Sequence, residues 1–251
     1  VMEMLSTNQW KRPMYFAVTI GNDYHLGLDP YLELTGMAYR ITPERSEDGR
    51  PRVNTAEMYE NMMHQFRFGN VNQPGIYLDE NTLRMCRTHR MMFAQLAEAL
   101  YMEGWQTEDT LVRKEKHAKA LQVLDYADEM LPACNVSYDH TSVSMAALYY
   151  ELDQPEKANT IMQAMADNAI EYIQWGASLD SQRRSSAQST INNYIAIFDY
   201  VMRNFMRFEQ KELFKAQLMN DPKNANKPEA VLEKIIEGKL NKHFEEVCLL
   251  N

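Results

Sequence analysis

The stretch from Phe93 to Pro132 constrains the fold most, because it has the pattern of two helices that fold back on each other. Apolar and small residues recur there at the intervals that place side chains on one face of a helix. Pro132 follows the second helix and would end it. Two helices joined by a turn cannot bury both apolar faces alone, so they stack against further helices. We therefore predict a mainly α chain built from helical hairpins.

The small residues in this stretch fit the tetratricopeptide pattern, in which they mark the close approach of two paired helices. The positions that fit are Leu96, Ala97, Leu100, Gly104, Ala120, Leu124, Ala127 and Pro132. Residues 106–116 would form an insertion that is longer than the usual turn. A second, more degenerate copy begins at Thr141, and Pro155 starts its second helix. The predicted architecture is an α-solenoid of tetratricopeptide-like hairpins.

Two more helices are predicted after these hairpins. A long helix would run from about Ser181 to Met219, and Pro228 would open a last helix that caps the array. The residues expected to face inward on the long helix are Ile191, Ile195, Phe198, Met202 and Phe205.

The N-terminal segment differs from the rest, because it is rich in β-branched and aromatic residues. Residues 14–20 (MYFAVTI) predict a buried strand that stops at turn-forming residues, and residues 37–41 predict a second strand. Two strands are not stable alone, so this small β-hairpin segment must pack on the helices. We therefore expect residues 1–53 to form a strand-containing segment and residues 54–251 to form the tetratricopeptide-like helical domain.

The composition argues against several classes of function. A net charge of −9 argues against a nucleic-acid partner, and no apolar run is long enough to span a membrane. Three scattered cysteines match neither a disulfide framework nor a zinc motif. No catalytic motif, cofactor loop or metal-ligand spacing occurs, so we predict no catalytic, cofactor-binding or metal-binding residue. Asp29 and Asp79 precede expected helix starts and are interpreted as helix caps.

Aromatic and basic side chains give a candidate interaction surface. The aromatic N-terminal residues could stack on a sugar, although packing between strands and helices is the favoured interpretation. Arg84, Arg87 and Arg90 advance by three along one helix, and a solvated or ion-paired face is favoured over an anion site. The candidate surface comprises Tyr15, Tyr24, Tyr31, Tyr39, Arg40, Tyr77, Arg84 and Arg87.

The text from Trp10 to Pro43 (WKRPMYFAVTIGNDYHLGLDPYLELTGMAYRITP) resembles a block in a bacterial multipass membrane family of unknown function. In that family, which is related to animal transmembrane protein O-mannosyltransferases, the block follows the last membrane span and precedes a tetratricopeptide-like tail. The matching positions are Trp10, Lys11, Arg12, Pro13, Tyr15, Phe16, Ala17, Gly27, Leu28, Tyr31, Leu32, Gly36, Ala38, Tyr39, Arg40 and Pro43. The resemblance extends to about Tyr150, and Thr35 stands where the family has Glu.

The resemblance implies a specific role. The sugar-lipid donor site and catalytic acid of that family lie in the membrane-embedded part, which this chain lacks. The chain would be a non-catalytic extracytoplasmic domain of a membrane-embedded glycosyltransferase, on the periplasmic face of the inner membrane. Because it begins at Val1, it would be a piece of a longer protein, without activity of its own. Its partners would be the membrane part of its own parent chain and an acceptor protein or glycan.

Two other functions stay open at this point. The first is a glycan-binding helical-repeat protein of an outer-surface uptake system, which would use exposed aromatic residues such as Tyr24 and Tyr77. The second is a soluble helical-repeat scaffold. Oligosaccharide binding that is lost on replacing either tyrosine would favour the first of these two.

Overall fold

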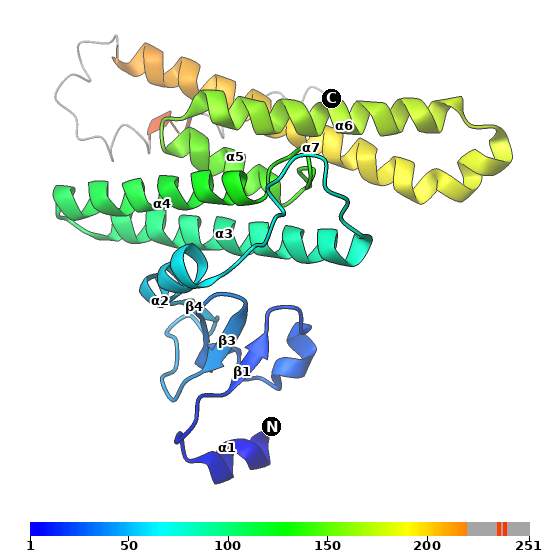
Figure 1. The fold of residues 1–251 in the computed structure, drawn as a ribbon. Helices are drawn as coiled ribbons and strands as arrows, with labels where there is room; N and C mark the ends of the chain where they lie inside the picture. The colour runs from blue at the N-terminus through cyan, green and yellow to red at the C-terminus, as the bar shows by residue number, and fades with distance from the viewer. Residues whose placement is uncertain (220–234, 237, 240–251) are drawn as a thin grey trace. The chain divides into compact units, whose positions relative to one another are not determined.

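The computed structural model describes residues 1–219, 235–236 and 238–239, and the chain forms two compact units, Val1–Leu152 and Asp153–Asn251. The described part is mainly helical with one small sheet, which confirms the predicted fold class at that level (Figure 1). Most of the helix expected from Pro228 lies outside the described residues. None of the described helices has both the length and the apolar character needed to cross a membrane.

The first unit begins with a four-stranded sheet of order β1-β3-β2-β4. β1 and β2 each pair with β3 in the antiparallel direction, whereas β4 pairs with β2 in parallel. The elements of this region are α1 (Met2–Asn8), β1 (Tyr15–Ala17), η1 (Asn22–His25), η2 (Asp29–Tyr31), β2 (Leu32–Leu34), β3 (Ala38–Ile41) and β4 (Arg52–Val53). The two predicted strands are therefore present as β1 and β3, but β1 is shorter than expected and two further strands join them.

Alternation along the strands gives the sheet its own small core. In β2, Leu32 and Leu34 are buried while Glu33 between them is partly exposed, as expected for a strand with one face covered. The core consists of Phe16, Leu32 and Ile41, with Leu5, Met14, Leu28 and Tyr39 packed around it. The predicted boundary after residue 53 stays a prediction, since the sheet and the helices that follow it belong to one compact unit.

Three helices of the first unit, α2, α3 and α4, begin at side-chain caps. The helices after the sheet are α2 (Thr55–Glu60) with the π-helical turn η3 (Asn61–Gln65), α3 (Glu80–Gln106), α4 (Thr110–Met130) and α5 (Ser142–Glu151). Asn54, Asp79 and Asp109 each accept backbone N–H bonds at the start of α2, α3 and α4. The chain turns from α3 into α4 within residues 107–109, so the longer insertion expected at residues 106–116 is absent.

α3 and α4 form an antiparallel hairpin, and they lie side by side in Figure 1. The residues that fit the tetratricopeptide pattern face the interior: Leu96, Ala97, Ala120, Leu124 and Ala127 are fully buried. Gly104 lies directly against the ring of His117, so the two helices approach closely where Gly104 lacks a side chain. Burial of these residues between α3 and α4 stabilises the hairpin, and charged residues lie on the outward faces of the two helices.

The second unit contains the helices α6 (Pro155–Ser178) and α7 (Ser181–Met219), which pack against each other. Gly176 of α6 lies against Ile191 of α7, and the Arg184 side chain donates to the carbonyls of Gly176, Ala177 and Leu179 at the end of α6. The two helices of the predicted second repeat, α5 and α6, belong to different compact units. A tetratricopeptide-like solenoid is therefore not confirmed.

Candidate functional site

The residues of the candidate surface lie on several separate elements. Tyr15, Tyr24 and Tyr77 are exposed on β1, on η1 and in the loop before α3. Tyr31 and Tyr39 are half-buried, and the Tyr39 ring meets the His25 ring edge-on at 5.8 Å between centroids. The remaining residues are Arg40 on β3 and Arg84 and Arg87 on α3. Tyr15 and Arg40 are register partners in the sheet, and they are the pair that the fold brings together.

Arg90 departs from the expectation of a solvated or ion-paired basic stripe. Arg84 is exposed and donates to the Asn81 side chain at 3.2 Å, but Arg90 is fully buried. Its guanidinium donates to the carbonyl oxygens of residues 131, 136 and 137 at 2.6, 2.6 and 3.0 Å. It also lies 4.9 Å from the centroid of the Tyr138 ring. Burial lowers the pKa of Arg90, and its bonds anchor the loop after α4 rather than an anion.

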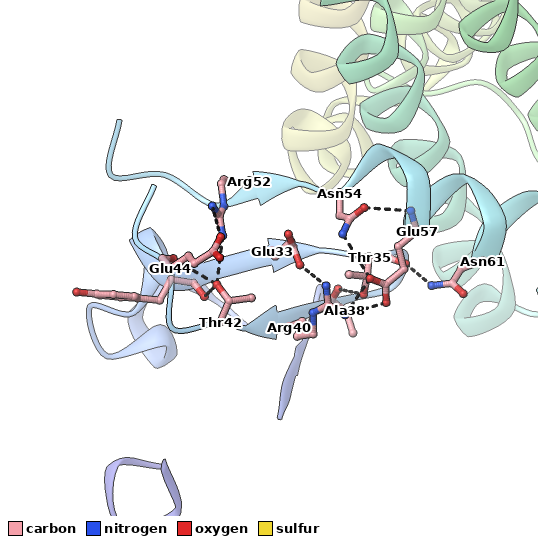
Figure 2. A network of polar contacts seen from close by, with 11 residues as sticks. Glu33, Thr35, Ala38, Arg40, Thr42, Glu44, Arg52, Asn54, Glu57 and Asn61 are labelled. Carbon is pink, nitrogen blue, oxygen red and sulfur yellow. Dashed lines mark hydrogen bonds and ion pairs between the residues drawn. The ribbon is translucent and has the colours of Figure 1, made fainter. Parts of the chain in front are cut away.

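The best-connected polar network of the first unit is centred on Arg40. Figure 2 shows its guanidinium between Glu33 of β2 and Glu57 of α2; it hydrogen-bonds Glu33 and lies 2.8 Å from the Glu57 carboxylate. The hydrogen bond to Glu33 raises the pKa of Arg40, although partial burial opposes this. The network joins strand to strand and sheet to helix, and its charges are largely satisfied within the protein.

Two further bonds extend this network along the sheet. Asn61 donates from Nδ2 to the carbonyl oxygen of Thr35 at 2.7 Å, so the π-helical turn is tied to the end of β2. Thr35 itself is buried and faces the backbone of Ala38. At the other end, Arg52 donates to Glu44 at 3.4 Å and to the Thr42 hydroxyl at 3.3 Å (Figure 2).

A pair between the buried His25 and the partly exposed Asp29 lies where a helix cap was expected. His25 Nδ1 is 2.8 Å from Asp29 Oδ1, and the imidazole is covered by the rings of Phe16 and Tyr39. Asp29 therefore does not cap a helix, whereas Asp79 does, since its carboxylate accepts from the N–H groups of Asn81 and Thr82. Those bonds lower the pKa of Asp79, the largest effect being the bond from the Thr82 hydroxyl. Within the described ranges, no group of three or more His, Cys, Asp or Glu side chains could hold a metal ion.

The second unit presents an exposed apolar stripe on α7. Ile195, Met202, Met206 and Leu213 are separated by seven, four and seven residues, so they share one helix face, and each is between 39 and 52 % exposed. Beside them, a groove of about 870 Å³ between α6 and α7 is lined by apolar side chains that include Ile170, Phe198 and Phe205. The prediction that Ile195 and Met202 face the interior is wrong.

Comparison with known families gives two matches, one near each end of the chain. Residues 1–61 match the family described as TMEM260-associated domain 2, and residues 199–251 match the family described as Elongation factor TS. Neither match covers half of the chain. No solved structure shows a significant match.

Curated relatives are elongation factors Ts. The chain is 56 % identical to elongation factor Ts of Pseudothermotoga lettingae over 41 residues, which are 16 % of this chain and 19 % of that protein. Identity to the Spiroplasma citri factor is 43 % over 53 residues, covering 21 % and 18 %. A longer match, 28 % identical over 117 residues, joins 45 % of this chain to 47 % of the Maridesulfovibrio salexigens factor. The chain thus spans about a fifth of the length of the first relatives.

These matches correct the function expected from the sequence. Similarity to elongation factor Ts contradicts the resemblance to the tail of a membrane transferase related to protein O-mannosyltransferases. It also contradicts the periplasmic location, the membrane and glycan partners, and the glycan-binding and scaffold alternatives. The resemblance relied on residues 10–150, whereas the family match to elongation factor Ts covers residues 199–251, for which the sequence analysis predicted only the end of a long helix and a capping helix.

Proposed function

We propose that the chain binds elongation factor Tu through residues 199–251 and promotes nucleotide exchange there, in the manner of elongation factor Ts. The observation that carries the proposal is the identity of 56 % over 41 residues to a curated elongation factor Ts. Identity at this level over a short segment is what a retained binding element would give. The match covers only about a fifth of the length of those factors. The proposal therefore assigns the binding of elongation factor Tu to residues 199–251 and no separate role in it to the rest of the chain.

The stripe on α7 supports an interaction with another protein. Met202, Met206 and Leu213 all fall inside the matched segment, and an apolar helix face left open to solvent is typical of a protein-binding surface. Met side chains suit such a face, because they are flexible and polarisable. We therefore place one contact for elongation factor Tu on this face of α7.

Release of a fluorescent GDP analogue from elongation factor Tu tests the proposal. The full chain should accelerate release, and the double variant Met206→Ala/Leu213→Ala should lose about tenfold or more in apparent affinity, since each side chain contributes roughly 1 kcal/mol when buried. The double variant Met102→Ala/Leu111→Ala is the matched control, because it removes exposed residues of the same types outside the matched segment. Failure of the unmodified chain to bind elongation factor Tu would end the proposal. If both double variants lost the same apparent affinity, the apolar stripe on α7 would not be the contact for elongation factor Tu.

We also propose that α3 and α4 are a tetratricopeptide-like hairpin. Burial of the small residues at the expected positions supports this, together with the contact between Gly104 and His117 and the end of α4 just before Pro132. In this proposal, the hairpin supplies a rigid core to the first unit. An experimental structure in which the crossing of α3 and α4 departs from that of tetratricopeptide repeats would contradict it.

A further inference from the structure

A second candidate site lies in the first unit, far in sequence from residues 199–251 and independent of the function proposed for them. A cavity of about 440 Å³ lies where the linker after α1 passes the end of β3 and the start of β4. Its lining includes Trp10, Thr42, three arginines (Arg12, Arg40 and Arg52) and two glutamates (Glu33 and Glu44). This volume falls within the range of ligand pockets in proteins.

The rim of the cavity is held in an unusual conformation. Gln9 and Trp10 both have positive φ, 48° and 59°, which is costly for residues other than glycine. The linker is closed by the Asn8 side chain, whose Nδ2 donates to the Arg12 carbonyl at 2.7 Å and whose Oδ1 accepts from the Arg12 N–H at 3.2 Å. The Trp10 side chain nevertheless stays 53 % exposed. The linker thus holds an exposed indole and a guanidinium at the same opening.

Arg12 is the one arginine of the lining that has no ion pair among the described residues. Arg40 is paired with Glu33 and Glu57, and Arg52 is paired with Glu44. Arg12 has no carboxylate at ion-pair distance among the residues that the structure describes. Three arginines and two glutamates line the cavity, and Glu57 balances the third arginine from outside the lining. The group is therefore neutral in sum, and the unpaired positive charge is local to Arg12. A guanidinium of this kind is best satisfied by a carboxylate from outside the protein.

We propose that this cavity binds an extended acidic peptide, with Arg12 paired to a carboxylate of the peptide and Trp10 covering the adjacent apolar side chain. The volume exceeds what a carboxylate alone would fill, and the lining combines an exposed aromatic surface with polar groups at the ends of strands. Arg40 and Arg52 act as a preformed floor, because their ion pairs already fix their positions.

The test uses the full chain and follows the Trp10 indole N–H resonance in ¹H–¹⁵N spectra. The probe is an N-acetylated, C-amidated tetrapeptide of alternating Asp and Leu, and the matched probe has Asn in place of Asp. The Asp peptide should shift the resonance saturably and bind about threefold or more tighter than the Asn peptide, as expected for a partly exposed ion pair. Arg12→Gln should remove this difference, whereas Arg84→Gln, which changes an exposed arginine on α3, should keep it.

Three outcomes would overturn the proposal. The first is equal binding of the Asp and Asn peptides to the unmodified chain. The second is an Arg12→Gln variant that still prefers the Asp peptide as the unmodified chain does. The third is binding of phenylacetate as tight as that of the peptide, which would assign the cavity to a small free carboxylate. The Arg12 side chain is exposed and unpaired among the described residues, so its replacement should leave the fold intact.

Discussion

Arg90 is the residue on which the ordered loop after α4 depends. Three backbone carbonyls of residues 131–137 converge on its guanidinium, and the Tyr138 ring covers it. These carbonyls have little regular structure around them, so they would be buried without partners if the guanidinium were absent. A single charged side chain of α3 thereby replaces the hydrogen bonds that a helix or strand would have supplied.

Replacing Arg90 should therefore destabilise the first unit strongly. Arg90→Met keeps the apolar part of the side chain and removes the donors, and we expect a loss of about 2–4 kcal/mol in the free energy of unfolding. The control Arg84→Met changes an exposed arginine on the same helix and should stay within about 0.5 kcal/mol of the unmodified chain. Urea denaturation followed by circular dichroism measures both. Equal stability of the two variants would show that the carbonyls find other partners.

Tyr149 predicts how stability depends on alkaline pH. Its hydroxyl donates to Asp125 at 3.0 Å, and burial first, then the Asp125 carboxylate, raise its pKa above the ordinary value of 10.0. Above pH 10 the unfolded chain loses this proton while the folded chain keeps it, so the contribution to stability present below pH 10 is lost as the pH rises. The free energy of unfolding should fall less steeply between pH 9.5 and 11 in Tyr149→Phe than in the unmodified chain. Tyr24→Phe, at an exposed position, should not change the slope, and a parallel slope in Tyr149→Phe would refute the prediction.

At the scale of single residues, the sequence predicted the role of a side chain only where its hydrogen-bond partners are close in sequence. Asp79 was recognisable as a cap because the N–H groups it binds are two and three residues away. Arg90 was not, since its partners lie more than 40 residues further along the chain. Asp29 was assigned to a helix start, but the fold brings the His25 side chain to it instead.

At the scale of elements, the α3–α4 hairpin depends on the absence of a side chain at Gly104. A Cβ at this position would lie 2.6 Å from Cδ2 of His117, whose ring is stacked on Tyr101 at 4.7 Å and meets Trp105 at 5.6 Å between centroids. Because the His117 ring contacts both of these aromatic rings, it cannot move away at low cost.

Gly104→Ala should therefore lower the free energy of unfolding, although alanine normally stabilises a helix. Overpacking costs about 1–3 kcal/mol and the helix propensity returns about 1 kcal/mol, so a net loss of about 1 kcal/mol is expected. Gly21→Ala is the control, because the nearest atom to a Cβ there is 3.8 Å away and its φ of −65° suits alanine. Thermal unfolding measures both variants. A higher melting temperature for Gly104→Ala than for the unmodified chain would contradict the close approach of the helices.

Element predictions succeeded where a periodic pattern was long and failed where pairing decided the structure. The helices α3 and α4 and their buried faces follow from repeated apolar spacing over 27 and 21 residues. β4 has two residues and forms only because it pairs with β2, so no local sequence pattern could predict it. On α7, Ile195 and Met202 were predicted to face inward because the helix looked amphipathic. Among the described helices of its unit α7 packs on α6, and these two side chains stay 47 and 39 % exposed.

At the scale of the whole molecule, the two family matches fall in different compact units. The match at residues 1–61 lies in the first unit, and the match to elongation factor Ts at residues 199–251 lies in the second. A function inferred from residues 10–150 therefore does not extend by itself to residues 199–251. This explains why a resemblance argued from residues 10–150 led to the wrong function for the chain.

Separate cores predict separate unfolding. The first unit buries Leu124 completely and the second buries Met165 almost completely. Leu124→Ala should lower the stability of the first unit by about 2–5 kcal/mol and increase hydrogen exchange of its amides, while amides of α6 and α7 keep their protection. Met165→Ala is the reciprocal variant, and it should affect α6 and α7 alone. If either variant raised exchange equally in both units, the chain would unfold as one cooperative body, and the binding segment at residues 199–251 would depend on the stability of the first unit.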